Sequence, residues 1–95
     1  MKLIWSAHAR ADRAAIFEFI ESDNPTAAAD IDEQIKKQVE TLILLPESGR
    51  KGRVKGTREL VVARTPFIAA YRIAGESIRI LRILHGAQRW PKSLP

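Results

Sequence analysis

Residues 57–91 read TRELVVARTPFIAAYRIAGESIRILRILHGAQRWP, and they carry the clearest secondary-structure pattern of the chain. Its short runs of β-branched and other apolar residues predict three successive strands, at residues 58–63, 67–73 and 77–84. Pro66 lies in the first connection, and Gly75 lies in a second connection short enough for a hairpin turn. Connections this short favour an antiparallel meander, which a basic and aromatic tail then follows.

The N-terminal half predicts one strand and two helices. Residues 2–5 are a short apolar strand, and the helices follow at residues 7–21 and 25–45. Ser6 and Asn24 are suited to cap the two helices through their side-chain oxygens. The second helix has apolar residues at helical spacing that should face the core: Ala28, Ile31, Ile35, Val39, Leu42 and Ile43.

The order of these elements predicts a single α+β domain over residues 1–95. Two long helices with a four-residue break between them, Ser22-Asp23-Asn24-Pro25, form an antiparallel helical hairpin. Such a hairpin must bury its apolar stripes, so we expect both helices on one face of the sheet. The first strand then pairs at the side of the three-stranded meander.

Composition narrows the class of protein. The chain has no cysteine, which excludes disulfides, thiolate metal sites and a cysteine nucleophile. No apolar run approaches the ~18 residues that a membrane helix needs, and no secretory signal is visible. We therefore expect a cytoplasmic protein with no membrane partner.

Charge is distributed unevenly along the chain. Residues 1–45 contain five lysines and arginines and eight acidic residues, a net charge of −3, whereas residues 46–95 contain eleven and three, a net charge of +8. This segregation favours an anionic partner, either a nucleic acid or an acidic protein surface, over simple solubility.

The segment 47–56, ESGRKGRVKG, has three glycines and four cations. This composition predicts a mobile loop. Its glycines do not have the spacing of a nucleotide-binding P-loop. Its cations are either solvated or hold a phosphate backbone or an acidic partner.

Three segments resemble one known family. They are SAHARADRAAIFEFIE at residues 6–21, GRVKGTRELVVARTPFIAAYRI at residues 52–73 and IRILRILHGAQRWP at residues 78–91. In this order they resemble the RelE/ParE superfamily of toxins from type II toxin–antitoxin systems. The resemblance covers essentially the whole chain. It implies a small toxin that a cognate antitoxin neutralises, with either of two targets: RelE-like members cleave mRNA on the ribosome, and ParE-like members inhibit DNA gyrase.

The RelE-like alternative needs a general base, cations for the phosphorane and a general acid. The second strand is apolar at residues 60–62, where the resemblance implies lysines, and Ile68 lies where it implies an arginine. No tyrosine follows His85. His85 and Arg82 remain the catalytic candidates, although a histidine at a strand end is more often structural.

The ParE-like alternative needs no catalytic residue, metal or cofactor, and we favour it. Its predicted target-binding residues are the exposed cations of the basic half and one tail aromatic: Arg50, Lys51, Arg53, Lys55, Arg58, Arg64, Arg89 and Trp90. A third alternative is a non-toxic domain that only takes part in autorepression with its antitoxin.

The resemblance also implies the partners. The antitoxin would be ParD-like or RelB-like, with an acidic C-terminal tail that lays a helix in an apolar groove beside the hairpin or adds a strand to the sheet. DNA gyrase is the expected target, with the ribosome and its mRNA as the alternative. DNA itself would be reached only indirectly, through the antitoxin.

Overall fold

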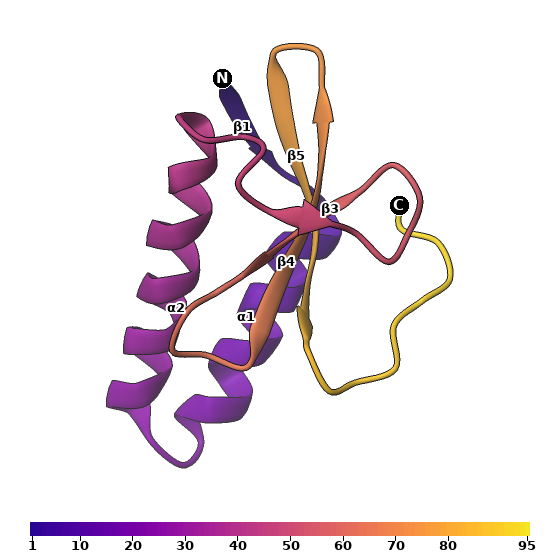
Figure 1. The fold of residues 1–95 in the computed structure, drawn as a ribbon. Helices are drawn as coiled ribbons and strands as arrows, with labels where there is room; N and C mark the ends of the chain where they lie inside the picture. The colour runs from indigo at the N-terminus through magenta and orange to yellow at the C-terminus, as the bar shows by residue number, and fades with distance from the viewer.

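The computed structural model describes residues 1–95 and contains a helical hairpin packed on a five-stranded sheet (Figure 1). The helices are α1 (Ala7–Glu21) and α2 (Pro25–Glu40), and a 3-10 turn, η1 (Thr41–Ile43), follows them. The strands are β1 (Lys2–Trp5), β2 (Arg50–Lys51), β3 (Arg58–Val61), β4 (Phe67–Ala74) and β5 (Ser77–His85). Neither helix combines the length and apolar character needed to cross a membrane. The predicted α+β fold is confirmed.

The sheet has the strand order β1-β5-β4-β3-β2. Strands β3, β4 and β5 form the predicted antiparallel meander, and β1 pairs in parallel with β5. Gly75 has a φ of +60° and is the first residue of the two-residue β4–β5 loop, where a type II′ turn requires this conformation. A β-bulge interrupts the pairing of β4 with β5. Tyr71 pairs with Ile80 and Ala70 with Arg82, which leaves Leu81 without a partner.

The face of the sheet under the helices carries the hydrophobic core. The helical hairpin and η1 contribute Ala9, Ile35, Val39 and Leu42 to it. The sheet side contributes Val62, Ala69, Tyr71, Ile78, Ile80 and Ile83. Burial of these apolar side chains is the main force that holds helices and sheet together.

The helix starts are as predicted, but the end of α2 is not. The Ser6 Oγ accepts a hydrogen bond from Ala9 N at 3.0 Å, and the Asn24 Oδ1 accepts one from Ala27 N at 3.1 Å. The predicted helix to residue 45 is too long, because α2 ends at Glu40. The Thr41 Oγ1 donates to the Gln38 carbonyl at 2.6 Å, and the chain tightens into η1.

The opposite face of the sheet, which we call the tail face, has no helix on it. Its buried apolar residues are Ile68, Ala70, Leu81 and Leu84. The C-terminal tail, residues 86–95, runs along this side of the molecule (Figure 1). The Gly86 N–H donates to the Pro66 carbonyl at 2.8 Å, and a Cβ at Gly86 would lie 3.3 Å from Ile68 Cδ1. The tail therefore begins against Ile68 on this face.

Candidate target-binding surface

The basic segment 47–56 is more ordered than a loop. Two of its residues form the edge strand β2, in which Arg50 pairs with Glu59 and Lys51 with Arg58. The prediction of loop throughout this segment is therefore wrong. The strand forms because β3 offers an unpaired edge directly beside it.

Tyr71 anchors the start of this segment from inside the core. Its hydroxyl donates to the Pro46 carbonyl at 2.7 Å and accepts from Gly49 N at 3.0 Å. Burial raises the pKa of Tyr71 above its ordinary value, so the hydroxyl is a poor acid or base near neutrality. A Cβ at Gly49 would lie 2.5 Å from the Tyr71 hydroxyl oxygen, so the close approach requires glycine.

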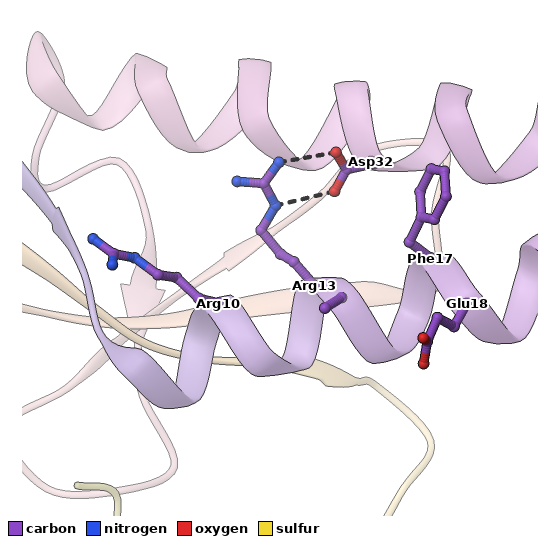
Figure 2. Close-up of a pocket in the computed structure, with 6 residues that line it drawn as sticks. Arg10, Arg13, Phe17, Glu18 and Asp32 are labelled. Carbon is purple, nitrogen blue, oxygen red and sulfur yellow. Dashed lines mark hydrogen bonds and ion pairs between the residues drawn. The ribbon is translucent and has the colours of Figure 1, made fainter.

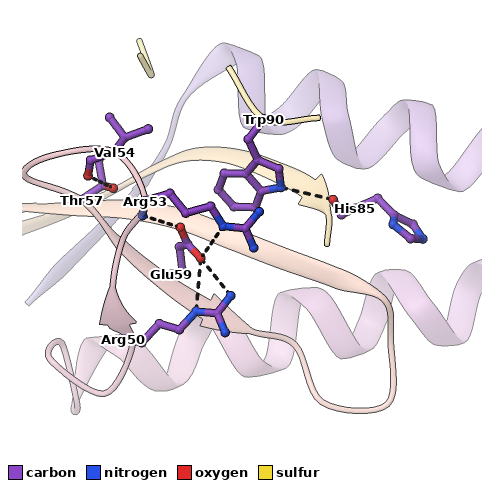
Figure 3. Close-up of polar contacts among 7 residues, drawn as sticks. All are labelled: Arg50, Arg53, Val54, Thr57, Glu59, His85 and Trp90. Carbon is purple, nitrogen blue, oxygen red and sulfur yellow. Dashed lines mark hydrogen bonds and ion pairs between the residues drawn. The ribbon is translucent and has the colours of Figure 1, made fainter. Parts of the chain in front are cut away.

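Glu59 organises the cations of the segment. Its side chain is 1% exposed and points to the tail face. Arg50 donates to Oε1 from Nη2 at 3.0 Å and from Nε at 3.2 Å, while the Arg53 backbone N–H donates to Oε2 at 2.8 Å and its Nε lies 3.4 Å from Oε1 (Figure 3). Charge-assisted bonds of this kind satisfy the buried carboxylate. Two guanidinium groups are thereby held at defined positions on the surface.

The C-terminal tail joins this cluster through Trp90. The Arg53 guanidinium carbon lies 3.9 Å from the centroid of the Trp90 ring. The Trp90 Nε1 donates to the His85 carbonyl at 3.3 Å, which ties the tail back to the end of β5 (Figure 3). A cation–π contact at an exposed site contributes about 0.5–1 kcal/mol. The tail and the basic segment therefore form one surface.

The other predicted target residues are placed differently. Arg58 is used within the fold, because its Nη1 donates to the Gly49 carbonyl at 2.8 Å and the Glu47 carbonyl at 3.2 Å. Lys51, Lys55 and Arg89 are exposed and take part in none of the ion pairs of the structure.

Arg64 lies apart from the Glu59 cluster, at the other end of β3. It lies beyond the C-terminal end of β3, whereas the segment carrying Lys55 precedes the N-terminal end of that strand. Arg64 also has a φ of 67°, which is rare for a residue with a side chain.

The two catalytic candidates are engaged in structural contacts. Arg82 donates to Asp12 from Nε at 2.7 Å and from Nη2 at 3.0 Å, and this hydrogen bonding raises the pKa of Arg82. The Ile83 N–H donates to the same carboxylate at 2.9 Å, so Asp12 ties α1 to β5. The His85 Nδ1 accepts from Ala87 N at 3.0 Å. The two side chains thus make separate contacts, Arg82 with α1 and His85 with the start of the tail.

Two carboxylates that position arginine side chains are absent from the predicted site residues. Glu59 holds Arg50 and Arg53, and Asp12 holds Arg82. A signal existed for Glu59, since it is the one acidic residue within an otherwise apolar and basic strand. Asp12 gave a weaker signal, because its partner is 70 residues away in the chain.

A second surface feature lies between the helices. A groove of about 390 Å³ is lined by Arg10, Arg13, Ala14, Phe17, Glu18 and Asp32 (Figure 2). Arg13 spans the hairpin, because its Nε and Nη2 each donate to an Asp32 oxygen at 3.0 Å. Phe17 points from α1 toward α2 and gives the groove an apolar wall (Figure 2).

Comparison with known proteins gives a consistent result. Residues 3–90 match the family described as the ParE toxin of type II toxin-antitoxin system, parDE. A protein of Sinorhizobium fredii with the name "Putative toxin Y4kP" is 41% identical over 93 residues, which cover 98% of this chain and 96% of that protein. Toxin RelE2 of Caulobacter vibrioides is 33% identical over 87 residues, covering 92% and 97%.

A solved structure agrees with these sequence matches. The chain superimposes on a chain of the chromosomal ParDE toxin–antitoxin system from P. aeruginosa with a TM-score of 0.82 and 35% identity. The match covers 90% of this chain and 95% of that one. Membership of a toxin–antitoxin family implies a cognate, ParD-like antitoxin as partner. This chain belongs to the ParE toxin family and is the toxin component of a type II toxin–antitoxin system.

Proposed function

We propose that this toxin inhibits DNA gyrase by binding it in a DNA-cleaved state through the surface made by the basic segment and the tail. The observation that carries the proposal is the Glu59 cluster, in which a buried carboxylate holds Arg50 and Arg53 beside Trp90. The catalytic candidates Arg82 and His85, in contrast, are engaged in contacts within the fold. These contacts support target binding, rather than acid–base chemistry, as the role of this surface.

The physical advantage of such a surface is preorganisation. Arginine side chains lose rotamer entropy when a partner immobilises them, at a cost of about 0.5–1.5 kcal/mol per side chain. Contacts with Glu59 and Trp90 already restrict these side chains in the folded toxin, so less rotamer entropy is lost when the target binds. The free cations Lys51, Lys55 and Arg89 at the margins would accelerate encounter with an acidic or DNA-bound target.

A gyrase assay tests the proposal. Purified toxin is incubated with gyrase, supercoiled plasmid and ATP, and the mixture is then denatured and the DNA resolved on a gel. Linear DNA that requires both proteins is the expected result. A toxin sample that arrests growth on expression but leaves gyrase unaffected would reject the proposal.

A RelE-like activity is the second candidate, favoured by the similarity to a protein named Toxin RelE2. In this case mRNA on translating ribosomes would be cleaved in the presence of the toxin. Substitution of His85 by alanine would abolish cleavage, whereas gyrase inhibition would tolerate that change. Cleavage mapping on ribosome-bound mRNA therefore separates the two candidates.

For the antitoxin, we infer that a helix of the ParD-like partner lies in the groove between α1 and α2. The support is the groove's composition, with Ala14 and Phe17 as its apolar wall and Arg10 and Glu18 at its margin. An amphipathic helix binds such a groove through its apolar face. Phe17→Ala should weaken antitoxin binding and leave gyrase inhibition intact, and both proteins would act in the cytoplasm.

A further inference from the structure

Two arginines face each other on the tail face of the sheet without any acidic partner. Arg72 of β4 is directly opposite Arg79 of β5 in the antiparallel register. Their sequence neighbours Tyr71, Ile78 and Ile80 are in the core under the helices, so alternation places both arginines on the tail face. Neither arginine takes part in an ion pair.

This arrangement is unfavourable in the isolated protein. Side chains directly opposite in an antiparallel pair have Cβ atoms only ~4.5–5.5 Å apart, and like charges there destabilise the sheet. Arg72 donates only a long hydrogen bond, from Nε to the Gly56 carbonyl at 3.4 Å, and Arg79 is exposed. Two guanidinium groups therefore remain available to an anion from solution.

The pair continues the cationic cluster around Glu59. Ala70 pairs with Glu59, so the arginine pair is two residues further along β4, or about 7 Å away on the same face. Glu59 is already shared by Arg50 and Arg53, and it forms no ion pair with Arg72 or Arg79. The face thus presents four arginines with one buried carboxylate among them.

The position of the pair indicates which anion fits. At the arginine pair the outer side of β5 is already occupied, because Arg79 pairs with Ile4 of β1, so a peptide cannot add a strand beside Arg79. A nucleic-acid backbone needs no such edge, because exposed cations at the spacing of its phosphates suffice. Arginine is also well suited to phosphate, since its planar fork binds two oxygens at once.

We propose that Arg72 and Arg79 form a phosphate-binding site through which this toxin contacts DNA directly. The site extends the Glu59 cluster into a continuous nucleic-acid surface on the tail face. This differs from the expectation that DNA is reached only through the antitoxin. It is also independent of gyrase, because only toxin and DNA take part.

The test is fluorescence anisotropy with a short fluorescein-labelled DNA duplex and the purified toxin. We compare the wild type with Arg72→Gln/Arg79→Gln across a range of salt concentrations. The double variant should bind the duplex roughly tenfold or more weakly. Its slope of log K against log salt should become shallower by about 2, because each lost phosphate contact reduces the slope by about 1. The matched control is Lys36→Gln/Lys37→Gln, which removes the same charge from exposed positions on α2 and should bind within about twofold of the wild type.

Thermal denaturation of the same variants provides a second test. Removing the repulsion should leave the melting temperature unchanged or raise it by up to a few degrees. The single variant Arg79→Gln, at an exposed position, serves if the double variant fails to fold. The proposal is overturned if the wild type does not bind the duplex, or if both double variants lose affinity equally. It is also overturned if polyglutamate binds the arginine pair as tightly as DNA does, since the site would then fit an acidic protein.

Discussion

The two faces of this sheet are both buried, but by different means. Under the helices, ten residues form one apolar cluster whose only strongly polar atom is the Tyr71 hydroxyl. On the tail face, four apolar residues are buried, and beside them an ionic cluster surrounds Glu59. The helical face explains why the chain folds, and the tail face presents the groups that a target can bind.

The difference matters because apolar packing and ionic clusters respond differently to substitution. A cavity in a packed core has no replacement for its lost contacts. A half-exposed arginine can instead turn to water when its partner is removed, so the free-energy cost is smaller. We therefore expect substitutions on the helical face to act on folding, and those on the tail face to act first on function.

The largest effect is expected for Ile35→Ala on the helical face. Ile35 is completely buried in the core cluster, and large-to-small substitutions of this kind cost about 2–5 kcal/mol. Urea denaturation should show this loss in the free energy of unfolding. A cost below about 1 kcal/mol would contradict the assignment of this face as the main source of stability.

A smaller effect is expected for Tyr71→Phe. The Tyr71 hydroxyl joins the core under the helices to the start of the basic segment. The variant leaves the Pro46 carbonyl and the Gly49 N–H without their partner, at a cost of about 1–3 kcal/mol. The raised pKa of Tyr71 means that the folded state favours the protonated phenol. Its contribution is therefore present below the ordinary pKa of 10.0 and declines as the pH rises through that value toward the raised one.

The pH dependence supplies the check on Tyr71. Chemical denaturation of the wild type at a series of alkaline pH values should show this decline. In Tyr71→Phe that decline should be reduced. Identical alkaline profiles for the two proteins would show that the hydroxyl is not buried in the way described.

On the tail face, Glu59→Gln should cost less stability than function. The amide retains one acceptor for the Arg53 N–H but loses the charge that holds both guanidinium groups. Because both arginines are about half exposed, we expect a loss of about 1 kcal/mol. Growth arrest on expression should be clearly weakened at unchanged protein levels. Full toxicity in the folded variant would show that the arginines need no organiser.

The smallest effect is expected for Arg64→Gly at the far end of β3. The left-handed backbone conformation at Arg64, with a φ of 67°, is unfavourable for any residue with a Cβ. Glycine adopts it freely, so thermal denaturation should show equal or slightly greater stability, by up to about 1 kcal/mol. Toxicity should be unchanged, because Arg64 lies apart from the Glu59 cluster; reduced toxicity at unchanged protein levels would place Arg64 in the target surface.

The helical face could be predicted from the sequence because it depends on local periodicity. The stripe through Ile35 and Val39 and the caps at Ser6 and Asn24 are all encoded within a few residues of each other. The end of α2 was missed because the 3-10 turn at Thr41 continues an apolar pattern that a helix would also show. The local sequence pattern therefore did not show where α2 ends.

The tail face could not be predicted in the same way because its contacts depend on register. The pairing of Arg50 with Glu59 requires an edge strand of only two residues, and the pairing of Asp12 with Arg82 joins distant parts of the chain. One signal was present in β5, where apolar residues do not strictly alternate with polar ones: Leu81 follows Ile80 directly, and Leu84 follows Ile83. A strand that is apolar on both sides must be covered on both sides.

Whether the basic segment and the tail form the gyrase-binding surface is tested by measuring the DNA cleavage by gyrase in the presence of the variant Lys55→Glu/Arg89→Glu. Both residues are exposed and make no ion pair, so circular dichroism and melting should match the wild type. The control Lys36→Glu/Lys37→Glu carries the same charge reversal on α2. The first variant should yield little linear DNA, and the control should yield as much as the wild type. Equal cleavage with the wild type and both variants would contradict the assignment of this surface.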